Sequence, residues 1–89
     1  VIAVVCQHFG VRPADLQGRR RTQSIALPRQ VAVFLARQLT SMSLEEIGGC
    51  FGGRDHSTVL YAIDKIRSRM EASRPFSLLM ADLETRAQH

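Results

Sequence analysis

Apolar residues along this chain recur three and four positions apart, and nowhere do they keep the strict alternation of a strand. Residues at that spacing share one face of a helix, so the pattern predicts an all-α fold, a small helical bundle. The first predicted helix covers residues 1–9 and stops at Gly10, because glycine favours a helix end. A short second helix over residues 13–16 opens on Pro13 and is closed by Gly18.

The next apolar stripe follows a polar connector that holds three arginines and residues 22–24. Pro28 is expected to open this longer helix, because proline fits the first helical turn. The stripe expected to face the core consists of Val31, Phe34, Leu35 and Leu39. The residues expected to project away from it are Arg29, Gln30, Val33 and Arg37.

A helix-turn-helix is predicted over about residues 43–70. Ser43-x-x-Glu46 is a capping box, which starts a helix of about two turns. Four glycines then crowd residues 48–53, and they permit the tight turn that two crossing helices need. A long helix begins near Asp55. The residues expected to point inward from the two helices are Leu44, Ile47 and Phe51, then Val59, Ile63, Ile66 and Met70. After Pro75, a last amphipathic helix is expected to pack back on the bundle.

The start of that long helix carries the candidate chemistry. In a helix-turn-helix the second helix enters the major groove of DNA with its N-terminus first. Asp, His, Ser and Thr side chains can form hydrogen bonds with base edges there, and backbone N–H groups of the first turn can bind phosphate. The residues at this position are Arg54, Asp55, His56, Ser57 and Thr58. For His56, a capping or solvated role is the alternative.

The composition of the chain indicates an anionic binding partner. The 89 residues suit a single domain, 1–89, and the net charge is +4 with a pI near 10.0. Eleven of the twelve cations are arginine, which binds phosphates and guanine edges in a fork. Residues 11–40 alone hold six arginines against Asp15. The excess centres on Arg19, Arg20 and Arg21, and predicts a basic loop over residues 18–24.

Other function classes find little support. Cys6 and Cys50 are isolated in sequence, so we expect two small buried side chains and no metal. Asp55, His56 and Ser57 are the residue types of a hydrolase triad, but consecutive helical residues point about 100° apart and do not face one another. No phosphate-binding loop for ATP is present. We therefore expect a domain that is not an enzyme and has no cofactor.

The location of the chain is expected to be cytosolic. No apolar run approaches the length of a membrane span, and the N-terminal stretch lacks the basic flank of a signal peptide. The first residue is Val and not Met, which indicates an excised or trimmed domain.

The run from Gly52 to Val59, Gly-Gly-Arg-Asp-His-Ser-Thr-Val, resembles the signature of the C-terminal DNA-binding domain, domain IV, of the bacterial chromosomal replication initiator DnaA. Shorter matches extend the resemblance over residues 2–66. They are Ser43-Leu44-x-Glu46-Ile47-Gly48, Asp15-Leu16, Pro28-Arg29-Gln30, Arg37-x-Leu39-Thr40 and Tyr61-Ala62-x-x-Lys65-Ile66.

The resemblance implies sequence-specific binding of duplex DNA at an asymmetric, TTATCCACA-like DnaA box, with one monomer per site. It implies base contacts from Asp55, His56, Ser57 and Thr58 in the major groove and from Arg21 in the minor groove, with Arg19 or Arg20 as the alternative by one register. Backbone or flanking contacts are implied for Arg19, Arg20, Arg29, Gln30, Arg37, Leu44, Arg54 and Lys65.

Two positions depart from the family pattern: Ser57 stands where many members have Thr, and Glu45 replaces the Pro of some members. A Ser keeps the hydroxyl but lacks the methyl that would contact thymine. The resemblance also implies a nucleoid-associated bacterial protein whose longer parent binds ATP in another domain. The alternatives are a DnaA-like transcriptional regulator, or a basic module that binds acidic lipid or a protein partner.

Overall fold

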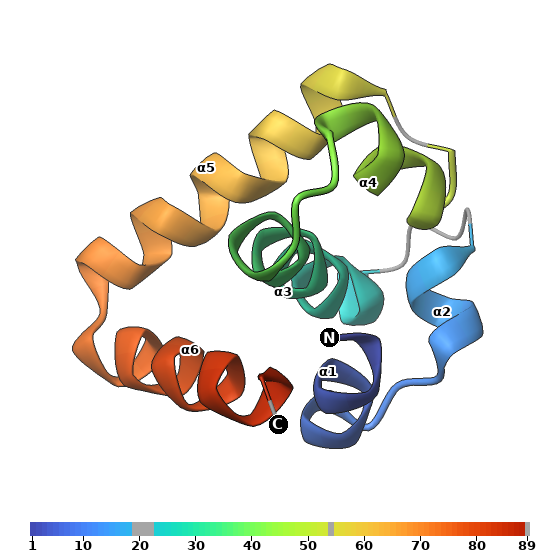
Figure 1. The fold of residues 1–89 in the computed structure, drawn as a ribbon. Coiled ribbons are helices and arrows are strands. Elements are labelled where there is room, and N and C mark those ends of the chain that lie inside the picture. The colour runs from blue at the N-terminus through green and yellow to red at the C-terminus, as the bar shows by residue number, and fades with distance from the viewer. Residues whose placement is uncertain (19–22, 54, 89) are drawn as a thin grey trace.

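The structure is a computed structural model that describes residues 1–18, 23–53 and 55–88. The described residues form six α-helices and no strand, which confirms the all-α fold (Figure 1). The helices are α1 (Ile2–Phe9), α2 (Pro13–Gln17), α3 (Gln23–Leu39), α4 (Leu44–Cys50), α5 (His56–Ala72) and α6 (Arg74–Ala87).

Helix α3 runs through the centre of the bundle, and each of the other five helices packs against it (Figure 1). All six residues of 31–36 are buried in consequence. The expectation that Arg29 and Val33 project away from the core is therefore wrong, since their exposed fractions are 6% and 2%. The middle of α3 is covered on every side, so this part of the helix has no solvent face to which these residues could turn.

Helix α3 also begins earlier than Pro28. Gln23 and Ser24, expected in the basic loop, are its first residues, and Pro28 lies inside the helix. An interior proline costs about 3 kcal/mol. The added turn buries Ile25, and full burial of such a side chain contributes about 1.5 to 3 kcal/mol. Leu27 is half-buried and packs against the core as well. The gain from these two apolar side chains is thus of the same size as the cost of the proline.

The last two helices meet at Ser73, which ends α5 and caps α6 by accepting a hydrogen bond from the backbone N–H of Phe76 at 3.3 Å. Met80 and Leu83 of α6 join the same core cluster as Val5 of α1. Helix α6 therefore packs back on the bundle, as the sequence predicted.

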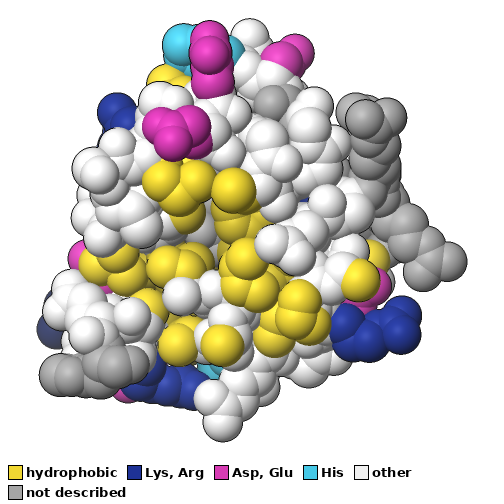
Figure 2. All heavy atoms as spheres, turned by 45° about the vertical axis from the view of Figure 1, so that its right-hand side comes forward, with side chains coloured by type: hydrophobic (Ala, Val, Ile, Leu, Met, Phe, Trp, Pro, Cys, Tyr) yellow, Lys and Arg dark blue, Asp and Glu magenta, His cyan; other side chains and the backbone are white. Residues whose placement is uncertain are grey.

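The prediction of two buried cysteines holds only in part. Cys6 is half-buried, but Cys50, the last residue of α4, is exposed. Cys50 lines a hollow of about 460 Å³ together with Val1, Ile2 and Met42. Figure 2 shows hydrophobic side chains gathered across the middle of one face of the molecule. In the described part of the chain, no helix is long and apolar enough to span a membrane.

Candidate nucleic-acid interface

Helix α4 is fixed at its start by the predicted capping box. The backbone N–H of Glu46 donates to Ser43 Oγ at 3.1 Å, and the backbone N–H of Ser43 donates to Glu46 Oε1 at 3.0 Å. The hydrogen bond from the Ser43 backbone lowers the pKa of the Glu46 carboxyl. The helix that precedes the turn is therefore held in one register by two reciprocal bonds.

The turn between α4 and α5 is built on Phe51, Gly52 and Gly53. Phe51 is buried, and the two glycines have φ of +92° and +68°. Side chains rarely tolerate this left-handed region, so the turn requires glycine at both positions. The predicted tight turn is confirmed at Gly52 and Gly53, whereas Gly48 and Gly49 belong to α4.

Asp55 caps the long helix that follows. Its Oδ1 accepts a hydrogen bond from the backbone N–H of Thr58 at 2.8 Å. That bond is the main reason why the pKa of the Asp55 carboxyl is lowered, and the His56 side chain acts in the same direction. The carboxylate is exposed. Oδ1 is thus occupied by the helix cap. The predicted contact with a base would therefore be made by Oδ2.

The side chains predicted to read bases differ in exposure. His56 and Ser57 are exposed at the first turn of α5, whereas Thr58 is half-buried. Thr58 lines a hollow of about 270 Å³ between α3 and α5, together with Arg29, Gln30 and Tyr61. The fold therefore brings Gln30 and Thr58, predicted for different contacts, to one place beside the first turn of α5.

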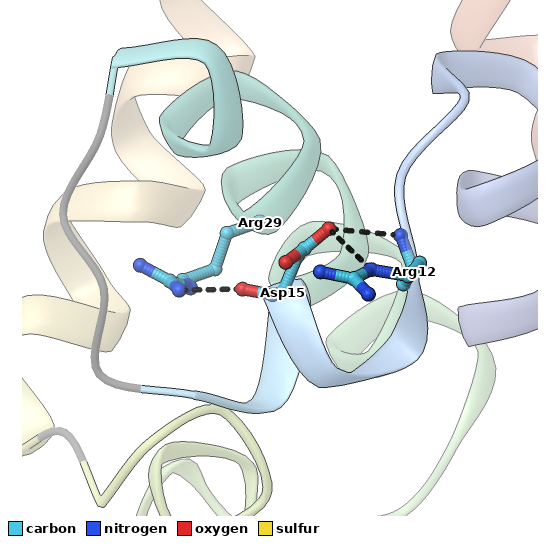
Figure 3. A network of polar contacts seen from close by, with 3 residues as sticks. All are labelled: Arg12, Asp15 and Arg29. Carbon is cyan, nitrogen blue, oxygen red and sulfur yellow. Dashed lines mark hydrogen bonds and ion pairs between the residues drawn. The ribbon is translucent and has the colours of Figure 1, made fainter.

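Arg29 is the buried cation of this region. Its Nε donates to the carbonyl of Leu16 at 3.0 Å, and its NH2 donates to the carbonyls of Asp15 at 2.7 Å and Gly18 at 3.1 Å. Figure 3 shows the guanidinium pointing at the backbone of α2. In this structure Arg29 holds the C-terminal end of α2, and its predicted contact with a DNA phosphate stays a prediction.

Asp15 links that end of α2 to its beginning. Its Oδ2 accepts a hydrogen bond from the backbone N–H of Arg12 at 3.0 Å and lies 3.8 Å from Arg12 Nε (Figure 3). Helix α2 is thus stabilised at its N-terminal end by Asp15 and at its C-terminal end by Arg29 of α3. The sequence identifies Asp15 as the acid among the six arginines of residues 11–40 and as part of a family match, but nothing in the local pattern indicates the Arg29 contact.

A second contact at this end of α2 involves Gly18 and Gly52. A Cβ atom on Gly52 would lie 2.5 Å from the carbonyl oxygen of Gly18 and 3.2 Å from its carbonyl carbon. The end of α2 and the turn before α5 are therefore in van der Waals contact. The sequence predicts Gly18 as a helix end and Gly52 as part of a tight turn, but it does not indicate that the two residues meet.

The remaining predicted contacts lie around this centre. Arg37 is exposed, and its NH1 donates to the carbonyl of Met42 at 2.9 Å, across the connection from α3 to α4. Leu44 is half-buried and packs on the core, and Lys65 is exposed on α5. Four predicted DNA contacts lie outside the described residues: Arg19, Arg20, Arg21 and Arg54.

Metal ligation has no support in the described part of the chain. There, no three His, Cys, Asp or Glu side chains are grouped in a way that could hold a metal ion.

Comparison with known proteins places these features in a family. The family model for the bacterial dnaA protein helix-turn-helix matches residues 1–66. The chain is 48% identical over 83 residues to the chromosomal replication initiator protein DnaA of Thermus thermophilus, in each of two strains. It is 41% identical over 86 residues to that of Lactobacillus acidophilus. These alignments cover 93% and 97% of this chain, which spans 19% of the length of each relative.

Proposed function

This chain belongs to the bacterial DnaA helix-turn-helix family, and from that premise we propose that it binds duplex DNA at DnaA-box-like sites of a replication origin. In this role it would bind origin DNA when chromosome replication is initiated. The domain itself has no enzymatic role and takes no cofactor, and ATP binding belongs to another part of a longer cytoplasmic parent protein.

One observation carries the proposal: the first turn of α5 presents exposed side chains of three different hydrogen-bonding types. Asp55, His56 and Ser57 supply a carboxylate, an imidazole and a hydroxyl in succession. Asp accepts from cytosine N4, His donates to a purine N7, and Ser bonds either way, so the three groups can distinguish base pairs in the major groove.

The shape of α5 agrees with this role. Its 17 residues make a rod of about 26 Å, since each residue adds about 1.5 Å. In helix-turn-helix proteins the N-terminal residues of the second helix contact base edges in the major groove, so the first turns of α5 would enter the groove while α6 packs against the same helix. The capped helix α4 and the glycine turn would then hold α5 against the groove, as in other helix-turn-helix proteins.

A second contact is proposed for the arginine run Arg19–Arg21. Narrow A/T-rich minor grooves have an enhanced negative potential that attracts arginine. Arg21 is assigned to this groove, with Arg19 and Arg20 on the phosphate backbone. Base reading and electrostatic anchoring are then divided between α5 and the basic run.

Fluorescence anisotropy with matched and scrambled box duplexes at two salt concentrations tests the proposal. We expect the box to bind roughly 10³-fold or more tightly than the scrambled duplex, and both affinities to fall with salt. Equal affinity for the two duplexes would contradict sequence-specific recognition. Binding to vesicles of acidic lipid that matches binding to the box would instead favour a basic anion-binding module.

A further inference from the structure

Three carboxylates lie at the end of the bundle where α5 begins: Glu45, Glu46 and Asp55, all of them exposed. The first turns of α4 and α5 lie side by side at the top of Figure 1, and the two helices pack against each other. Figure 2 shows acidic side chains gathered at the same upper end of the molecule. The end of the fold that is proposed to meet DNA thus carries these acids, although the net charge of the chain is +4.

Two of the three carboxylates are used to cap helices. Glu46 Oε1 accepts from the backbone N–H of Ser43 at 3.0 Å, and Asp55 Oδ1 accepts from the backbone N–H of Thr58 at 2.8 Å. The side chain of Glu45 differs, because within the described residues it takes part in no hydrogen bond or ion pair. Its charge favours the N-terminus of α4, as any acid in a first turn does, but its carboxylate is open to the solvent.

Helix-turn-helix geometry would place the Glu45 carboxylate beside the phosphate backbone. In such proteins the first helix crosses the backbone, while the N-terminal residues of the second helix contact base edges. Here α4 is the first helix and α5 the second, and Glu45 stands in the turn of α4 that lies next to the start of α5 (Figure 1). A carboxylate repels phosphate, and in water at contact distance this repulsion corresponds to a roughly fivefold change in affinity.

We propose that Glu45 is an affinity-limiting residue, whose charge weakens the binding of this domain to every duplex. Phosphates are present in all DNA, so the repulsion acts on the box and on other sequences by the same factor. Non-specific binding is essentially electrostatic, so Glu45 keeps it weak, and stable binding then requires the base contacts of α5. This inference rests on the proposed function, because it takes the end formed by α4 and α5 as the side that faces DNA.

A charge series at Glu45 tests the repulsion. Glu45→Gln removes the charge at nearly constant size, and Glu45→Lys reverses it. In anisotropy titrations at about 50 mM salt, we expect Glu45→Gln to bind box and scrambled duplexes roughly two- to fivefold more tightly than the wild type. Glu45→Lys should show about the square of that gain, roughly 4- to 25-fold. Both gains should shrink at about 300 mM salt, because salt screens exposed charges.

The direction of the effect separates repulsion from a structural role. Loss of a favourable charge at the start of α4 destabilises the helix, which can weaken binding but cannot strengthen it. Unchanged or weaker binding of both Glu45 variants on both duplexes would therefore overturn the proposal. A loss confined to the box would also overturn it, since that result would mean that the Glu45 carboxylate accepts from a cytosine amino group.

Glu71→Gln is the matched control, because it removes the same charge from another exposed glutamate. Glu71 lies in the last turn of α5, about 22 Å along the helix from His56, since each residue adds about 1.5 Å. This separation exceeds twice the screening length of about 10 Å in 0.1 M salt, so we expect near wild-type affinity. A gain equal to that of Glu45→Gln would show that net charge alone matters, and would overturn the role of this position.

The same titrations distinguish failure of this inference from failure of the proposed function. Equal binding of box and scrambled duplexes by the wild type would contradict sequence-specific recognition. A gain for Glu45→Gln on both duplexes, absent in Glu71→Gln, would still support repulsion from phosphate. A strong preference for the box together with unchanged affinity of Glu45→Gln would have the opposite meaning: the proposed function would stand, and the affinity-limiting role of Glu45 would be overturned.

Discussion

Asp55 caps α5, and the proposed function gives it a second task, a base contact made from the same position. Its Oδ1 caps α5, and its exposed carboxylate faces the solvent that DNA would replace. Aspartate suits both tasks because a charged acceptor strengthens the cap and still accepts from a base amino group. The charge that would repel a phosphate is partly offset by the adjacent N-terminus of the helix.

The Asp55 cap should make stability depend on pH in the acid range. Its pKa is lowered in the folded state, so its contribution is fully present above the pKa of the unfolded chain and is lost as the pH falls through the folded value. Asp55→Asn keeps a capping oxygen but does not titrate there. We expect denaturant unfolding from pH 7 to pH 2 to show a steeper loss for the wild type than for Asp55→Asn below about pH 4. Parallel curves would contradict this, since Glu46, whose pKa is also lowered, is present in both proteins.

His56→Ala should weaken binding to box DNA by about 1 to 3 kcal/mol and leave binding to the scrambled duplex almost unaffected. The reason is that His56 would contact its base only in the box sequence. His8→Ala is the control, since His8 is an exposed histidine on α1 and outside the proposed interface. Anisotropy titrations of both variants on both duplexes provide the measurement. Equal weakening on the two duplexes would show that His56 does not read bases.

At the scale of elements, local signals predicted most boundaries. Gly10 ends α1 with φ of +68°, Pro13 opens α2, and Ser43 caps α4 as expected. The predicted start of α3 at Pro28 is wrong, because the helix begins at Gln23 and Pro28 lies in its interior. The local preference of Pro28 lost to the burial of Ile25, which depends on contacts that the local sequence does not show.

Ser43→Ala should lower the free energy of unfolding by about 1 kcal/mol, because the first turn of α4 loses its capping oxygen. For a domain of this size that corresponds to a fall of about 4 to 8 °C in Tm. Ser41→Ala is the matched control, since Ser41 is exposed and precedes the helix. Calorimetry of both variants checks the difference. Similar Tm values for the two variants would mean that the capping box adds no stability.

At the scale of the molecule, α6 completes a core that the family match does not cover. The match ends at residue 66, yet Met80 and Leu83 are as buried as the core residues of α3. Helix α6 packs on α1, α3 and α5, so it closes the bundle on the side opposite α4 (Figure 1). We infer that it supports the position of α5 without entering the DNA interface.

Leu83→Ala should lower the free energy of unfolding by about 2 to 5 kcal/mol, the usual effect of a buried leucine truncated to alanine. Leu78→Ala on the same helix should have little effect, because that side chain is 59% exposed. Urea unfolding of the two variants gives the comparison. Box affinity at a temperature where both are folded should match the wild type, and a selective loss in Leu83→Ala would place α6 in the interface.

The candidate site was predictable where residues are adjacent in sequence and not where they meet in space. The first turn of α5 could be identified from Asp55 to Thr58, since one turn of helix keeps sequence neighbours together. The contact of Arg29 with the end of α2 joins residues 11 to 14 positions apart. Gly18 and Gly52 are farther apart still. Such contacts depend on the packing of whole helices, which the hydrophobic pattern does not specify.

The packing of α6 on α1 has a practical consequence for attaching the domain to a surface. Gln88 follows α6, and the end of this helix lies on the side of the bundle away from the start of α5 (Figure 1). A biotin tag or a fluorophore joined after α6 would therefore be held on the side remote from the nucleic acid. Val1 is less suitable, because it lines a hollow together with Cys50 and Phe51, next to the turn before α5.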